Sequence, residues 1–242
     1  MALLTDPLTD RTELVKLFSD SDFIRSVDLA ADVTRQTGYE TAFRVARGLL
    51  CEEKVIIGDE ESVGGNTGRR RLAREFKEKF GISALLNPKK FSKYVEEKNR
   101  TEIGEYFPNE CGSSEAVNHE CIFDFHTHPS YSMTTDLKYI EIPSSLDLRR
   151  LGRPIGMVLA VSHKSRSAFC LYNSKVSNKD LKKFNGEIED QHYSPDLPLD
   201  YRMQEAGLVR GVFSKDKFVF HRYSEYGEQF SIEATEALAM LK

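Results

Sequence analysis

Helix-like and strand-like hydrophobic patterns alternate along this 242-residue chain, which predicts an α/β (α+β) fold with a single mixed β-sheet flanked by helices. The length and the 40% apolar content suit one large domain with its own core. No Pro-, Gly- or Ser-rich linker divides the chain. We therefore expect a single domain over residues 1–242, with a core at about 13–175 and an extension at 176–242 that completes or caps the sheet.

The N-terminal region predicts one helix followed by two strands. Apolar residues recur at mainly helical spacing over residues 11–36, and Gly38 favours a helix end directly after them. Apolar side chains then alternate over Thr41–Leu50, as in a half-buried strand. Glu52-Glu53 are expected to form a turn, and Lys54–Ile57 a second strand.

The stretch from residue 69 to residue 100 is strongly basic. It holds eleven Lys or Arg residues against four Glu, a local charge of +7. Apolar residues at helical steps around Phe76 and Tyr94 predict two amphipathic helices. We interpret residues of about 67–118 as a basic insertion, for which a solvated surface is the simpler reading and contact with an acidic partner the alternative.

The second half of the chain supplies most of the predicted sheet. Cys121–Phe125 has the pattern of a buried strand, and a loop over residues 129–143 follows it. Ser144 or Ser145 is suited to cap a short helix that runs through Leu151. Two hairpins and a closing helix are then expected, at Ile155–Ser162 with Ser167–Tyr172, at Gly207–Phe213 with Lys217–Tyr223, and at Ile232–Leu241.

Composition restricts the class of protein. A formal charge of −4 lacks the basic excess typical of nucleic-acid binding, so nucleic acid is an unlikely partner. No apolar run approaches the ~20 residues that span a bilayer, and the N-terminal residues lack a secretory pattern. Four cysteines without framework spacing are typical of a reducing compartment. We expect a cytoplasmic protein without a membrane partner; nothing in the sequence indicates an oligomeric state.

One short segment has the residues of a metal site. His126 and His128 leave the end of a predicted strand, and residues i and i+2 of a strand project from the same face. Asp147 follows in the first turn of the predicted helix, where a carboxylate is favoured. Two imidazoles, one carboxylate and one water form a four-coordinate Zn²⁺ site with an open position, which is the catalytic type.

These residues resemble the JAMM (MPN-plus) metalloprotease family, whose pattern is an upstream Glu, His-x-His-Pro, a loop, and Pro-Ser-x-x-Asp. The resemblance covers about Thr37 to Tyr172 and implies an MPN/cytidine-deaminase-like architecture. It implies Zn²⁺ as the cofactor and assigns a role to each residue of a catalytic site. These are His126, His128 and Asp147 as zinc ligands, Ser144 as a donor to the oxyanion, and Glu40 as the general base, with Glu52 and Glu53 as alternatives to Glu40.

The resemblance implies a zinc-dependent hydrolase that cleaves an amide or isopeptide bond, with a ubiquitin-like protein or its conjugates, joined at a Gly-Gly tail, as the partner. Two features depart from the family pattern. The loop between His128 and Ser144 has 15 residues, and Gly48 lies farther from Glu40 than in Glu-x-x-Gly. The long loop is either a lid or an ordered insertion.

Three other readings stay open. A non-catalytic MPN-like scaffold would lack one or more metal ligands, whereas all three are present here. The string from Asp124 to His128 also resembles the start of PHP-type phosphoesterases, although too few residues follow it for that barrel. Cys111, His119 and Cys121 form a further candidate metal group, for which ordinary loop residues are the better interpretation because a fourth ligand is missing.

Overall fold

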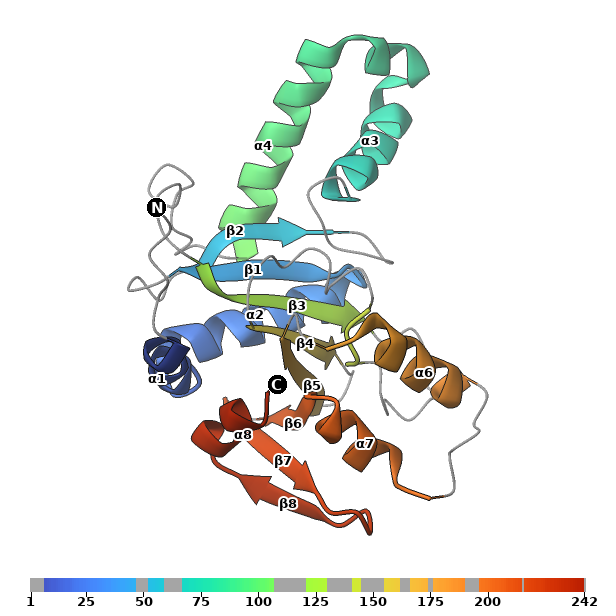
Figure 1. Cartoon of the computed structure of the whole chain (residues 1–242). Helices are drawn as coiled ribbons and strands as arrows, with labels where there is room; N and C mark the ends of the chain where they lie inside the picture. The colour runs from blue at the N-terminus through green and yellow to red at the C-terminus, as the bar shows by residue number, and fades with distance from the viewer. Residues whose placement is uncertain are drawn as a thin grey trace, which may run out of the picture.

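The computed structural model describes residues 7–46, 52–58, 67–106, 121–129, 141–144, 155–161, 166–173, 176–189, 196–214 and 216–241. In this part of the chain, helices surround one eight-stranded mixed sheet with the strand order β2-β1-β3-β4-β5-β6-β7-β8 (Figure 1). The prediction of a mixed α/β fold with a single sheet is thus confirmed. None of the described helices is long and apolar enough to cross a bilayer.

Most neighbouring strands of the sheet are antiparallel. The exception is the pair β3–β4, which is parallel. The strands are β1 (Thr41–Ala46), β2 (Glu52–Ile57), β3 (Cys121–Pro129), β4 (Ile155–Val161), β5 (Arg166–Asn173), β6 (Val209–Ser214), β7 (Phe218–Tyr223) and β8 (Gln229–Ile232). The helices are α1 (Pro7–Leu17), α2 (Ser21–Thr37), α3 (Thr67–Phe80), the short 3₁₀ helix η1 (Ile82–Leu86), α4 (Pro88–Tyr106), α6 (Asn178–Glu189), α7 (Leu199–Glu205) and α8 (Ala234–Met240).

The N-terminal region differs from the prediction in two places. The single expected helix is two, because Asp20 caps a new helix by accepting hydrogen bonds from the N–H groups of Asp22 and Phe23. Gly38 ends α2 in the left-handed conformation, with φ of 73°, as predicted. The expected turn at Glu52-Glu53 is wrong, since both residues lie in β2 and pair with β1. Cross-strand pairing overrides the low strand preference of glutamate there.

One face of the sheet is covered by α1, α2 and α8. Its core is rich in aromatic rings that pack edge-on, and Phe18 contacts four others at centroid distances of 5.1 to 6.1 Å. These partners come from α2, β3 and β7, so the N-terminal helix packs against strands from both halves of the chain. The C-terminal region therefore belongs to the same core as the N-terminal helices.

The opposite face carries a second, smaller core beneath α6 and α7. Strands β4 and β5 contribute Val158, Cys170 and Tyr172, and Ile142 joins them from the segment 141–144. The sequence prediction missed α6, α7 and β8. A signal for α6 was present, since Ser177 and Asp180 form a reciprocal cap in which the Asp180 N–H donates to Ser177 Oγ at 3.0 Å.

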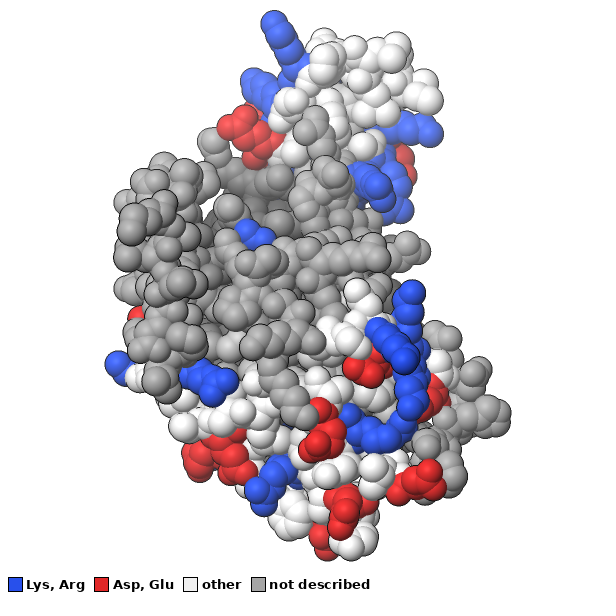
Figure 2. Space-filling view, in the orientation of Figure 1, with Lys and Arg blue, Asp and Glu red and all other residues white. Residues whose placement is uncertain are grey.

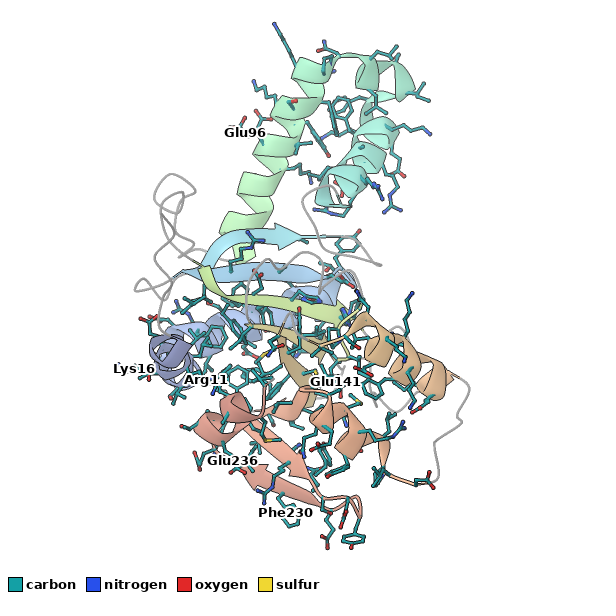
Figure 3. All side chains as sticks on the ribbon, viewed as in Figure 1. Arg11, Lys16, Glu96, Glu141, Phe230 and Glu236 are labelled. Atoms are coloured by element: carbon teal, nitrogen blue, oxygen red, sulfur yellow. The ribbon has the colours of Figure 1, made fainter. Side chains whose placement is uncertain are left out.

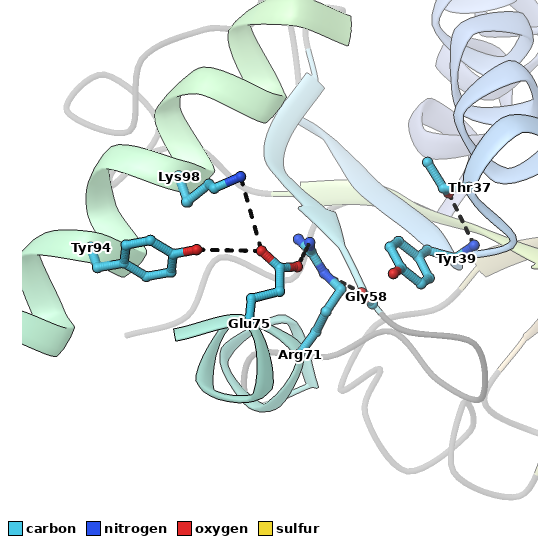
Figure 4. A network of polar contacts seen from close by, with 7 residues as sticks. All are labelled: Thr37, Tyr39, Gly58, Arg71, Glu75, Tyr94 and Lys98. Atoms are coloured by element: carbon cyan, nitrogen blue, oxygen red, sulfur yellow. Dashed lines mark hydrogen bonds and ion pairs between the residues drawn. The ribbon is translucent and has the colours of Figure 1, made fainter. Parts of the chain in front are cut away.

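The basic insertion forms a helical hairpin, made of α3, η1 and α4, that projects from the edge of the sheet at β2 (Figure 1). Its base is fixed by Arg71, which is buried at 5% exposure. Arg71 Nε donates to the carbonyl of Gly58 at 3.1 Å, and Nη1 donates to Glu75 at 2.8 Å (Figure 4). The Arg71 guanidinium also lies 5.1 Å from the ring centroid of Tyr39. Arg71 thereby attaches the hairpin both to Tyr39, before β1, and to Gly58, after β2.

Three buried threonines join α2 to the centre of the sheet. Thr127 Oγ1 on β3 lies 2.6 Å from Thr34 Oγ1 on α2 and accepts a hydrogen bond from the Thr41 N–H at 2.8 Å. Thr34 Oγ1 also donates to Thr41 Oγ1 at 3.3 Å. All three residues are at most 2% exposed, so no solvent replaces these partners. The network fixes which face of β3 turns toward α2.

We predict that Thr127→Val lowers the free energy of unfolding by about 1–3 kcal/mol, because the shape is kept while a buried N–H and a buried hydroxyl lose a partner. Denaturant unfolding followed by circular dichroism measures the change. Thr235→Val on the exposed side of α8 is the matched control and should cost less than ~0.5 kcal/mol. Equal losses in the two variants would contradict the importance of the network.

Candidate functional site

The two histidines of the predicted metal site converge at the end of β3. Nε2 of His126 lies 3.2 Å from Nε2 of His128, and the ring centroids are 5.0 Å apart. His126 is 7% exposed, whereas His128 is half-buried. The expectation that alternation along a strand brings both rings to one face agrees with this geometry. At that separation one ring can also donate an N–H hydrogen bond to the other when no ion is bound.

The alternation assigns the residues of β3 to two environments. Phe123 and Phe125 belong to the core beneath α1 and α2, and Thr127 contacts α2 on that face. Asp124, His126 and His128 therefore lie on the face that also carries the smaller core. Asp124 forms an ion pair there with Arg44 of β1 at 2.9 Å.

Glu40 immediately precedes β1, at the end of the strand where His128 lies. Ala42 pairs with His126 in the antiparallel register, and two further residues along each strand bring position 40 opposite position 128. Glu40 is buried at 8% exposure, and its carbonyl accepts a hydrogen bond from the Gly58 N–H at 2.7 Å. The register therefore brings Glu40 to the histidine end of the sheet.

The two alternative glutamates lie elsewhere. Glu53 pairs with Arg44 and Glu52 with Val45, toward the opposite end of β1. Arg44 is four residue steps from Glu40 along the strand, which is a distance of about 13 Å at ~3.3 Å per step. The pairing of β2 thus distinguishes Glu40 from both alternatives by position, a distinction that the sequence pattern alone did not provide.

The segment 141–144, which carries Ser144, is anchored to the same face by a buried ion pair. Glu141 is fully buried, and its Oε1 accepts a hydrogen bond from Nε of Arg210 on β6 at 2.8 Å. Arg210 also forms an ion pair with Asp200 of α7. Ile142 packs into the smaller core, and Ser144 is half-buried two residues later. Residues of the C-terminal extension therefore hold the segment that contains the candidate serine.

The electrostatics of this anchor are those of a desolvated pair. Burial, the largest single effect, lowers the pKa of Arg210, but the charge and hydrogen bond of Glu141 together with Tyr223 and Cys170 outweigh it, so the pKa of Arg210 lies above its ordinary value. Burial, with Glu141 as the next contribution, raises the pKa of the Cys170 thiol, which is consequently a neutral packing group. Glu141 Oε2 is buried, and no residue in the described part of the chain donates a hydrogen bond to it. The carboxylate therefore depends on Arg210 for its compensation.

The structure brings together only part of the predicted site. His126 and His128 share one face at the end of β3, Glu40 precedes β1 at the same end of the sheet, and Ser144 belongs to a segment packed on that face. Asp147 lies outside the described residues, as do Cys111 and His119 of the alternative metal group. Among the residues that are described, no group of three or more His, Cys, Asp or Glu is arranged to hold a metal ion. Zinc ligation by His126, His128 and Asp147 stays a prediction.

Sequence reasoning missed the Glu141–Arg210 anchor. A signal existed for one partner, because Glu141 interrupts the apolar string Tyr-Ile-Glu-Ile, a position where a charge needs a buried counterion. The other partner is 69 residues away and is an ordinary strand arginine in the sequence. Only the completed sheet identifies that pairing.

Comparison with known proteins supplies no relative: no family model, no curated protein and no solved structure matches the chain.

We predict that Arg210→Met lowers the free energy of unfolding by about 3–5 kcal/mol, because it leaves the Glu141 carboxylate buried without a cation. Chemical denaturation of purified variants measures the loss. Arg222→Met removes an exposed pair with Glu236 of α8 and should cost at most ~1 kcal/mol. Combining Arg210→Met with Glu141→Leu should recover much of the loss, and a double variant as unstable as Arg210→Met would show that charge burial is not the cause.

Proposed function

We propose that this protein is a zinc-dependent hydrolase that cleaves an amide or isopeptide bond, with an MPN/cytidine-deaminase-like architecture and the JAMM arrangement of catalytic groups. The observation that carries the proposal is the 3.2 Å separation of the two histidine Nε2 atoms at the end of β3. The position of Glu40 at the same end of the sheet supports it further.

The histidine pair fits one tetrahedral zinc ion. Two nitrogens that each lie ~2.0–2.1 Å from a tetrahedral Zn²⁺ are about 3.3 Å apart. The 3.2 Å separation of the two Nε2 atoms is close to that value, so both nitrogens are near enough to bind the same ion. His126, His128 and Asp147 would hold the ion, and zinc bound there would polarise a carbonyl and lower the pKa of a coordinated water toward ~7.

The remaining chemistry falls to side chains of this chain. Glu40 would accept a proton from the attacking water as the new C–O bond forms, and would transfer that proton to the leaving nitrogen as the C–N bond breaks. The Ser144 hydroxyl would donate a hydrogen bond to the oxygen of the tetrahedral intermediate.

The substrate class follows from the resemblance: the bond joins the Gly-Gly tail of a ubiquitin-like modifier to an amine. A Gly-Gly tail can pass through a narrow site in extended form because glycine has no side chain. Cleavage assays on a panel of Gly-Gly-linked modifiers, with and without zinc, would test this assignment. A zinc-loaded chain that cleaves none of them would contradict the substrate class while leaving the metal site intact.

We predict that Glu40→Gln lowers kcat by about 10²–10⁴-fold, the range for removing a general base, while zinc stays near one ion per chain. Cleavage kinetics together with metal analysis of the same preparation measure both quantities. Glu53→Gln on β2 is the matched control and should change neither. If Glu40→Gln also lost the metal, Glu40 would be a ligand rather than the base.

We further predict that His126→Ala loses zinc and activity together. His221 on β7 is a suitable control, since it is a strand histidine with 8% exposure against 7% for His126. His221→Ala should reduce stability but retain the metal. Zinc titration monitored by thermal unfolding separates the two, because an ion that binds only the folded state raises the melting temperature. Stoichiometric zinc in His126→Ala would refute ligation by His126.

A further inference from the structure

The large exposed apolar side chains gather at two places in the described part of the chain. Three lie in the turn of the α3–α4 hairpin and three around the β7–β8 turn. They are Phe80, Ile82 and Leu86 in the first group, and Leu197, Tyr226 and Phe230 in the second. Such contiguous exposure is typical of interaction sites.

The first group lies in a basic environment, which we name the basic tip and define as residues 77–93. It holds five Lys and one Glu, a net charge of +4. Ile82 and Leu86 are 69% and 85% exposed. The tip has its own support, because the Phe76 ring packs against Phe80 and Phe91 with centroids 4.8 and 5.4 Å apart. These apolar side chains are thus presented on a packed hairpin.

The second group lies in an acidic environment, which we name the acidic end and define as residues 224–236 together with Leu197. Residues 224–236 hold four Glu and no Lys or Arg, a net charge of −4. Tyr226 is 82% exposed, and Phe230 is 43% exposed with the Arg222 guanidinium 5.9 Å from its ring centroid. Leu197 is part of this surface because the next residue, Pro198, lies beside Gly227.

The two surfaces lie at opposite ends of the molecule. The hairpin follows β2, one edge strand, whereas Tyr226 and Phe230 belong to the turn before β8 and to β8 itself, the other edge strand. Figure 2 shows blue side chains at the end formed by the hairpin and more red ones at the opposite end, where Figure 3 labels Phe230 and Glu236. Residues 69–100 carry +7 in a chain of −4, so the other residues together carry −11.

We propose that the basic tip of one molecule binds the acidic end of a second copy, so that the chain associates head to tail. The two surfaces match in charge, and each presents the other with apolar side chains to bury. A symmetric contact would bring two basic tips or two acidic ends together and would be repulsive. An anionic lipid surface would account for the basic tip alone and leave the exposed Tyr226 and Phe230 without a role.

A contact between different surfaces at opposite ends does not close on itself unless the rotation between copies forms a ring. Each added molecule therefore presents a fresh surface at each end. We expect species that grow beyond dimers as concentration rises, and that dissociate at about 1 M salt, where the Debye length is ~3 Å. This inference is independent of the proposed hydrolase activity.

The test uses two charge-cancelling variants of the full chain. Lys79→Glu with Lys90→Glu removes the net charge of the basic tip, and Glu225→Lys with Glu228→Lys removes that of the acidic end. Lys179→Glu with Lys182→Glu, on the exposed side of α6, makes the same charge change elsewhere and is the control. Circular dichroism verifies that each variant is folded, and sedimentation velocity at low salt measures association.

We expect each of the first two variants to associate at least about tenfold more weakly than the wild type, and the control to associate normally. An equimolar mixture of the two weakened variants should form a heterodimer and stop there, because only one intact surface of each kind remains. A wild-type chain that is monomeric at every concentration at low salt would overturn the proposal. So would a mixture without heterodimers, or a monomeric wild type that binds phosphatidylserine vesicles through Lys79 and Lys90.

Discussion

The register of β3 is the constraint on which the rest of this structure depends. Its odd-numbered residues from Phe123 to Thr127 face α1 and α2, and its even-numbered residues carry both histidines to the other face. A slip of one residue would place imidazoles in an aromatic core and phenyl rings in the site. The buried threonine contacts oppose that slip because Thr127 must meet both Thr34 on α2 and the Thr41 N–H on β1.

The second constraint couples the distant halves of the chain. The candidate serine belongs to a short segment that has no strand or helix of its own, and the pair between Glu141 and Arg210 gives that segment a fixed place on the sheet. A buried ion pair of this kind fixes where the segment lies more than it stabilises the fold, since the desolvation of the two charges offsets most of their attraction. The C-terminal strands are consequently part of the frame of the site, although they contribute none of its predicted catalytic residues.

Local signals were sufficient for much of the fold. The helix end at Gly38 and the strand that carries His126 and His128 follow from patterns within a few residues, and the structure has both. Features that depend on residues far away in the sequence could not be predicted from local patterns. Glu52 and Glu53 enter a strand because β1 pairs with them, and Arg210 acquires its role from a glutamate 69 residues away. The register also distinguishes Glu40 from its alternatives, which spacing along the chain could not do.

The basic insertion adds a positively charged helical hairpin to the edge of the sheet. Arg71 attaches the hairpin by donating to the carbonyl of Gly58, and the Gly58 N–H in turn donates to the carbonyl of Glu40. Gly58 therefore links the foot of the hairpin to the residue proposed as the general base. The apolar turn of the hairpin lies at the far end of two helices, α3 and α4, away from this connection (Figure 1). The proposed contact with a second copy would therefore be made at the end of the hairpin that lies away from β1 and from the candidate site on β3.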